Sequence, residues 1–137
     1  MRASVAGQSP ACEPSACRER TRRRRVLVVD DNPDIAAGAS RFLELLGYEV
    51  AVALDGRQAL EVAREFRPDV ALLDVGLPHI DGYELARRLR SEYGPEVLLI
   101  IITAYAGDNP RRREYEAYFD RHFTKPLDLT TIADLLS

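Results

Sequence analysis

The sequence predicts an α/β fold in which a parallel β-sheet carries helices on both faces. From residue 26 onward, short apolar runs alternate with helical patterns, and the run at residues 97–102 is apolar throughout. A strand without apolar and polar alternation is typical of a parallel sheet that is buried on both faces. Short links between successive strands and helices favour right-handed crossovers. Together these observations indicate one doubly wound domain.

Bulk composition agrees with a single globular domain. The chain has 137 residues, of which 46% are hydrophobic and 30% are charged. Its apolar runs are far shorter than the roughly 18 residues of a membrane span, and the first 25 residues lack the apolar stretch of a secretory signal. We therefore expect a cytoplasmic location and no membrane partner.

Five apolar runs supply the expected strands. Each run is short and is bounded by Asp, Gly or Pro, as strand ends usually are. The expected strands are residues 26–29, 48–53, 70–73, 97–102 and 122–124.

Each expected helix begins at a side chain that can cap its first turn. Asn32 caps the first helix, Pro33 suits its first turn, and Gly47 suits its end. Apolar residues then recur at helical spacing, which directs one face of this helix toward the core. The caps of the four later helices are Asp55, Asp81, Asn109 and Asp128.

Charge divides the chain into two parts. Residues 1–25 carry seven arginines and two glutamates, a net charge of +5, whereas the remainder carries 12 basic and 20 acidic residues, a net charge of -8. We expect a disordered basic arm at residues 1–24 and a folded domain at residues 25–137. The arm is interpreted as a solvated tail, and the alternative is that the arginines at 22–25 bind nucleic acid or an acidic partner.

Polar residues follow four of the five expected strands. Asp30 and Asp31 end the first, Asp74 the third, Thr103 the fourth and Lys125 the fifth. In an open α/β sheet, ligands bind at these carboxyl ends, where the strand order reverses. The second strand is followed only by a helix cap and offers no such residue. This agrees with the strand order 2-1-3-4-5, in which the second strand lies at the edge of the sheet, away from the site. The sequence thus predicts one site at this end of the sheet.

The residue types at this site indicate phosphoryl chemistry with a bound cation. Three carboxylates about 5 Å apart repel by roughly 3 kcal/mol per pair at an effective dielectric constant near 20, so a positive charge is needed. Mg²⁺ prefers a few carboxylates together with phosphate oxygens. Lys125, the one lysine in the chain, adds a positive charge, and Thr103 adds a hydroxyl donor. Each of these residues alone also has an ordinary structural explanation, such as a helix cap or a turn.

Four stretches carry a resemblance to a known family. They read VLVVDDNP at 26–33, ALLDVGLP at 71–78 with DG at 81–82, IIITA at 100–104, and FTKP at 123–126. On these motifs, residues 25–136 resemble a response-regulator receiver domain, a flavodoxin-like fold. The sequence around the third strand is similar to that of receivers attached to hybrid histidine kinases. The chain is also similar to single-domain response regulators.

The resemblance implies a role for each site residue. Asp74 would be the phosphoacceptor. Asp31 and Asp74 would bind Mg²⁺ directly, together with the carbonyl of Gly76, and Asp30 would hold a metal-bound water. Lys125 would contact the phosphoryl group.

The resemblance also implies a switch, and here the sequence departs from the family. Thr103 would move toward the phosphoryl group, while His122 stands where the family often has a rotating Tyr or Phe. Tyr118 stands where the family usually has Gly in a left-handed conformation. We expect Tyr118 to cost on the order of 1 kcal/mol or to force a different loop, and the fourth helix to be loosely held.

The predicted function is phosphorylation-controlled signalling. A histidine kinase or histidine phosphotransfer protein would phosphorylate Asp74, and a downstream protein would bind at the fourth helix and fifth strand. No enzymatic output and no nucleic-acid partner are expected, and the chain leaves no room for an output domain of its own. Two alternatives remain, namely a receiver-like binding module that does not use phosphate and a haloacid-dehalogenase-type phosphatase. The phosphatase motif needs a second Asp where Gly76 stands.

Overall fold

A five-stranded parallel sheet forms the centre of the molecule. The computed structural model describes residues 25–104, 110–125 and 128–136. Within these residues the strand order is β3-β2-β4-β5-β6, which is the predicted order 2-1-3-4-5 when the strands are counted along the chain. The predicted flavodoxin-like architecture is therefore confirmed. The strands are β2 (Arg25–Val29), β3 (Glu49–Ala53), β4 (Val70–Asp74), β5 (Leu98–Thr103) and β6 (Arg121–Thr124).

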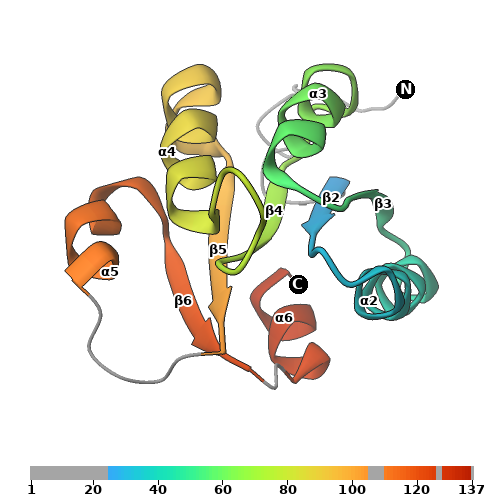
Figure 1. The fold of residues 1–137 in the computed structure, drawn as a ribbon. Helices are drawn as coiled ribbons and strands as arrows, with labels where there is room; N and C mark the ends of the chain where they lie inside the picture. Colours follow the sequence, from blue (N-terminus) through green and yellow to red (C-terminus); the bar gives the residue numbers. More distant parts are fainter. Residues whose placement is uncertain (1–24, 105–109, 126–127, 137) are drawn as a thin grey trace.

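Helices cover both faces of this sheet, as predicted (Figure 1). Alternate side chains of each inner strand enter two separate cores: Leu27 packs with the core under α3 and α4, whereas Val28 packs with the core under α2 and α6. The helices are α2 (Pro33–Leu45), α3 (Gly56–Phe66), α4 (Gly82–Tyr93), α5 (Pro110–Tyr115) and α6 (Leu129–Leu136), and two 3₁₀ turns lie at Gly94–Glu96 and Glu116–Tyr118.

The predicted caps are present wherever the structure describes them. Asn32 Oδ1 accepts the backbone N–H of Asp34 at 2.9 Å, and Asp55 Oδ1 accepts that of Gln58 at 2.7 Å. Gly47 follows α2 with a φ of +101°, a conformation that suits glycine. Asp81 and Asp128 cap α4 and the start of α6 in the same way, whereas Asn109 lies outside the described residues.

The loop at Tyr118 takes a different course instead of a strained one. Among the described residues, only Arg67 and His79 are non-glycine residues with positive φ, so Tyr118 does not adopt the left-handed conformation. It lies in the second 3₁₀ turn, and its carbonyl accepts a hydrogen bond from Arg90 Nε at 3.3 Å. Of the two outcomes expected for Tyr118, a strained residue or a different loop, the structure therefore shows the different loop.

Arg90 ties together three segments around this loop. Its guanidinium donates to the carbonyls of Gly94 and Val97 at 2.9 and 2.8 Å, and it forms an ion pair with Asp120 at 2.7 Å. Asp120 in turn accepts the N–H of Leu99 at the start of β5. By contrast, α5 has only six residues and none of them is buried. The loop after α5 is thus anchored, whereas α5 contacts the core through the partly buried Tyr115, and its expected looseness stays a prediction.

The predictions of a disordered arm and of no membrane-spanning segment also concern residues outside the described ones. The basic arm at residues 1–24 lies outside them, so its predicted disorder stays a prediction. Across the parts of the chain that the structure describes, no helix is long and apolar enough to cross a membrane.

Candidate functional site

Three carboxylates converge at the carboxyl end of the sheet. Asp30 and Asp31 follow β2, and Asp74 ends the neighbouring strand β4. One oxygen from each carboxylate lies within 4.8 Å of the others. Asp30 and Asp74 are only 6% and 7% exposed, whereas Asp31 is exposed. The structure therefore brings together the carboxylates that the strand ends predicted, in a set that a hard divalent cation fits.

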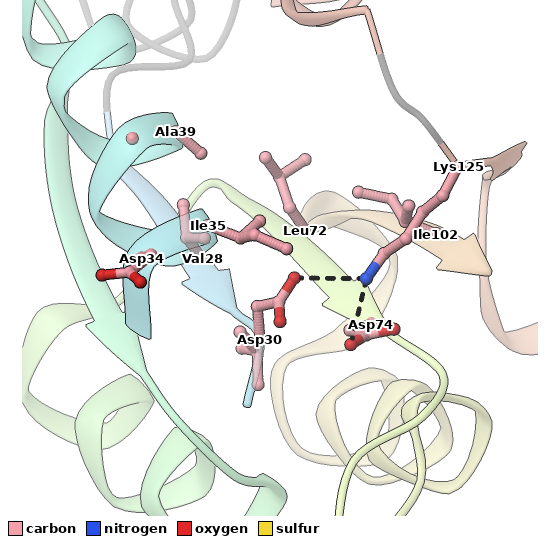
Figure 2. A pocket seen from close by; sticks show the side chains of 11 residues that line it. Val28, Asp30, Asp34, Ile35, Ala39, Leu72, Asp74, Ile102 and Lys125 are labelled. Carbon is pink, nitrogen blue, oxygen red and sulfur yellow. Dashed lines mark hydrogen bonds and ion pairs between the residues drawn. The ribbon is translucent and has the colours of Figure 1, made fainter. Parts of the chain in front are cut away.

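Lys125 closes this group from the far side of the site (Figure 2). Its Nζ lies 3.4 Å from Asp30 Oδ2 and 3.3 Å from Asp74 Oδ2. Burial by itself lowers the pKa of Lys125, but the negative charges of Asp74 and Asp30 outweigh burial and leave this pKa raised. The ammonium group is therefore held in its charged form beside both carboxylates.

Opposing effects act on the pKa of the Asp74 carboxyl group. Burial raises the pKa of its carboxyl group, while the N–H of Gly76 and the charge of Lys125 act in the opposite direction. The Gly76 N–H donates to Asp74 Oδ1 at 3.2 Å, and Lys125 faces the other oxygen. The net pKa stays raised, so the buried carboxylate lacks full charge compensation in the chain itself. An added cation would supply that compensation.

Thr103 lies at the end of β5, the strand next to Asp74. It is 5% exposed, and its carbonyl accepts the N–H of Lys125 at 2.7 Å. The register pairs Asp74 with Ile102, the residue immediately before Thr103. Adjacent strands thus present Asp74, Thr103 and Lys125 at one end of the sheet, as the sequence predicted.

Gly82 lies so close to the end of β4 that only glycine fits there. A Cβ at this position would lie 2.6 Å from the backbone oxygen of Asp74 and 3.0 Å from the Cα of Val75. The start of α4 therefore packs directly against the backbone that carries Asp74. The Asp-Gly pair at 81–82 is visible in the sequence as part of a motif, but no sequence signal links Gly82 to the backbone of Asp74.

His122 contacts Tyr83 instead of facing open solvent. Its Nε2 lies 3.0 Å from the Tyr83 hydroxyl, and the two rings stack with centroids 6.2 Å apart at an interplanar angle of 13°. Burial is the main cause that lowers the pKa of His122, and the charge of Arg112 adds to it. Burial and the charge of Arg112 therefore favour the neutral imidazole. Tyr83 lies 39 residues away, so no sequence signal linked the pair.

The comparisons with known proteins agree on one family. A family model described as the response regulator receiver domain matches residues 26–137. The transcriptional regulatory protein PrrA of Mycobacterium tuberculosis is 39% identical over 108 residues, which are 79% of this chain and 46% of PrrA. The chain therefore spans about half the length of this relative.

Solved structures give the same result. A CheY-like receiver domain from Methanospirillum hungatei superposes with a TM-score of 0.75 at 27% identity, over 83% of this chain and 90% of that one. A response regulator from Burkholderia pseudomallei, whose structure contains a phosphorylated aspartic acid and a calcium ion, gives a TM-score of 0.74 at 25% identity, over 83% and 66%. The fold, the acidic strand ends and these matches lead to one conclusion: the chain belongs to the response regulator receiver domain family, whose members act in two-component signal transduction.

Proposed function

We propose that Asp74 accepts a phosphoryl group from the phosphohistidine of a histidine kinase or histidine phosphotransfer protein. The observation that carries this proposal is the convergence of three carboxylates with Lys125, whose Nζ lies 3.3 Å from Asp74. The similar regulator from Burkholderia pseudomallei contains a phosphorylated aspartic acid, which supports the same chemistry here.

The transfer step follows from the groups around Asp74. An oxygen of its carboxylate attacks phosphorus, the bond from phosphorus to the donor nitrogen breaks, and an acyl phosphate forms on Asp74. Lys125 would hold a phosphoryl oxygen, and the Thr103 hydroxyl would donate to another. The chain acts on itself in this step, and we propose no further catalysed reaction.

Mg²⁺ is the cation that we propose for this site. Asp31 and Asp74 would hold it together with the carbonyl of Gly76, and Asp30 would hold one of its waters. When bound, Mg²⁺ neutralises the charge that gathers as the phosphoryl group arrives. The carboxylate of Asp30 is already engaged, since Oδ1 accepts the N–H of Asn32 at 2.9 Å and Oδ2 faces Lys125. Asp31, being exposed, keeps its oxygens available.

The direct test is phosphorylation by acetyl phosphate with Mg²⁺, followed by intact-mass measurement. The wild-type chain should gain one acid-labile phosphoryl group, and Asp74→Asn should gain none while keeping its fold. Asp34→Asn is the matched control, because Asp34 is an exposed carboxylate on the adjacent helix. A phosphoryl group on the Asp74→Asn variant would refute the assignment.

The metal assignment has its own test by titration. Asp31→Ala should weaken Mg²⁺ binding far more than Asp30→Ala, because only Asp31 is proposed to touch the ion. Equal losses in the two variants would contradict this division of roles.

The output surface is proposed to lie at α5 and β6. An ion pair between Arg111 and Asp81 at 2.8 Å links α5 to the loop after β4, so a shift of that loop would reach α5 directly. A downstream protein partner would bind this surface inside the cytoplasm. Hydrogen exchange with and without beryllofluoride should change more over residues 110–124 than over Gly56–Phe66. A larger change in α3 would place the output elsewhere.

A further inference from the structure

A cavity of about 610 Å³ lies beside the phosphoacceptor, between α2 and one face of the sheet. Its floor is apolar, formed by Val28, Leu72 and Ile102 from three adjacent strands. Figure 2 shows these side chains next to Ile35 and Ala39 of α2, with Asp30, Asp74 and Lys125 at one end. The volume and the largely apolar lining are those of a small-molecule site. Phosphoryl transfer uses only the polar end.

The cavity exists because α2 presents small residues to the sheet. Gly38 and Ala39 line it, and a Cβ at Gly38 would meet nothing within 4 Å. Ala36 and Leu43 are the residues of α2 that are buried, so the helix is anchored on both sides of this stretch. Ile35, at the rim, remains 50% exposed although it is large and apolar. An apolar ligand would therefore gain contacts here without displacing any side chain.

The polar end of the cavity selects the charge of the ligand. Asp30 and Asp74 line it together with one cation, Lys125, whereas the carboxylate of Asp34 points away from this end (Figure 2). The formal charge of this end is two negative and one positive, which leaves a net of one negative charge. A carboxylate ligand would be repelled, and a neutral one would leave this charge uncompensated. An ammonium group matches it.

We propose that this cavity binds a small amphipathic organic amine. The apolar body of the amine lies between α2 and the sheet, and its ammonium group lies at Asp30 and Asp74. The binding itself depends only on the cavity and its charge. Its regulatory consequence rests on the proposed function: the amine and Mg²⁺ draw on the same carboxylates, so each lowers the affinity of the protein for the other. Bound amine would therefore oppose phosphorylation of Asp74.

Calorimetric titration with 2-phenylethylamine tests the inference on the full chain. Two matched ligands separate the contributions: 2-phenylethanol keeps the apolar body without the charge, and methylamine keeps the charge without the body. We expect 2-phenylethylamine to bind at least about tenfold more tightly than either, and added Mg²⁺ to weaken it. Equal binding of 2-phenylethanol would overturn the role of charge, and equal binding of methylamine would overturn the role of the cavity.

A pair of variants in α2 locates the binding. Gly38→Leu fills the cavity and should weaken 2-phenylethylamine about tenfold or more, whereas Ala37→Leu adds the same side chain to an exposed position outside the cavity and should leave affinity unchanged. In the wild-type chain, nuclear Overhauser contacts from the ligand should reach the methyl groups of Ile35 and Ile102. This measurement stands even if Gly38→Leu fails to fold. Missing contacts, or equal effects of the two variants, would overturn the proposal.

The proposed function is judged by a separate result. If acetyl phosphate labels Asp74 but the amine does not bind, only the cavity inference fails. If the amine binds but Asp74 is not labelled, only the proposed function fails.

Discussion

Replacement of Gly82 by alanine should destabilise the fold and at the same time disturb Asp74, the proposed phosphoacceptor. The new Cβ would lie 2.6 Å from the backbone oxygen of Asp74 and 2.9 Å from its carbonyl carbon. Such separations are well inside normal contact distances, and no side-chain rotation can relieve them because the opposing atoms belong to the backbone. Either α4 or the end of β4 must move.

The expected size of the effect follows from two opposing contributions. Alanine in place of glycine favours a helix interior by up to about 1 kcal/mol, but Gly82 stands at the first residue of α4, where this gain is smaller. Overpacking against a rigid neighbour costs about 1–3 kcal/mol. We therefore expect Gly82→Ala to lower the free energy of unfolding by about 1–2 kcal/mol.

Gly38→Ala provides the matched control. Gly38 lies inside α2, and its new Cβ would meet nothing within 4 Å, so this variant should gain up to about 1 kcal/mol. Urea unfolding of the two variants should shift in opposite directions from wild type. Phosphorylation by acetyl phosphate should be slower in Gly82→Ala because the backbone of Asp74 is displaced. If Gly82→Ala were as stable as wild type and were phosphorylated at the same rate, the contact would not constrain the site.

Three further predictions concern side chains around α4. Burial lowers the pKa of His122, so its contribution to stability is complete above the unfolded value near 6.5 and is lost as the pH falls through the folded pKa. Urea unfolding measured at about pH 7.5 and again at about pH 5 gives the stability that each protein loses on acidification. His122→Phe should lose less than wild type, and equal losses in the two proteins would contradict this. Hydrogen bonds from Arg87 lower the pKa of Glu84 from 4.5 to about 2, so stability is lost as the pH falls from 4.5 toward 2. Glu84→Gln should remove that part of the acid sensitivity in thermal unfolding, and an unchanged acid profile would argue against it. Arg90→Met should cost about 1–3 kcal/mol, because several carbonyls and Asp120 lose their partner, whereas Arg88→Met at an exposed position should cost far less.

Most of the fold could be predicted because its determinants are local in the sequence. Apolar runs define the strands, and Asn32, Asp55 and Asp81 define where helices begin, each through a hydrogen bond to a residue two or three positions ahead. Strand limits differed slightly, as with β5, which begins at Leu98 and includes Thr103. The site could be predicted for a related reason, because parallel strands bring their carboxyl ends to one edge.

The contacts that were not predicted join residues far apart in the sequence. Arg90 reaches Asp120 over 30 positions, and Tyr83 reaches His122 over 39. No periodicity or cap relates such residues, since only the tertiary fold brings α4 close to residues 120–122. The cavity was also missed, because small residues such as Gly38 are equally compatible with close packing and with open space.

The placement of Lys125 has a consequence for spectroscopy. Lys125 is the one lysine in the sequence, and its Nζ lies within 3.4 Å of both Asp30 and Asp74. Isotopic labelling of lysine alone would therefore give a single side-chain ammonium signal, positioned beside Asp74, the proposed phosphoacceptor. A cation at the carboxylates or a phosphoryl group on Asp74 would change the field at that nitrogen. One resonance would thus report the chemical state of the site without any added label elsewhere in the chain.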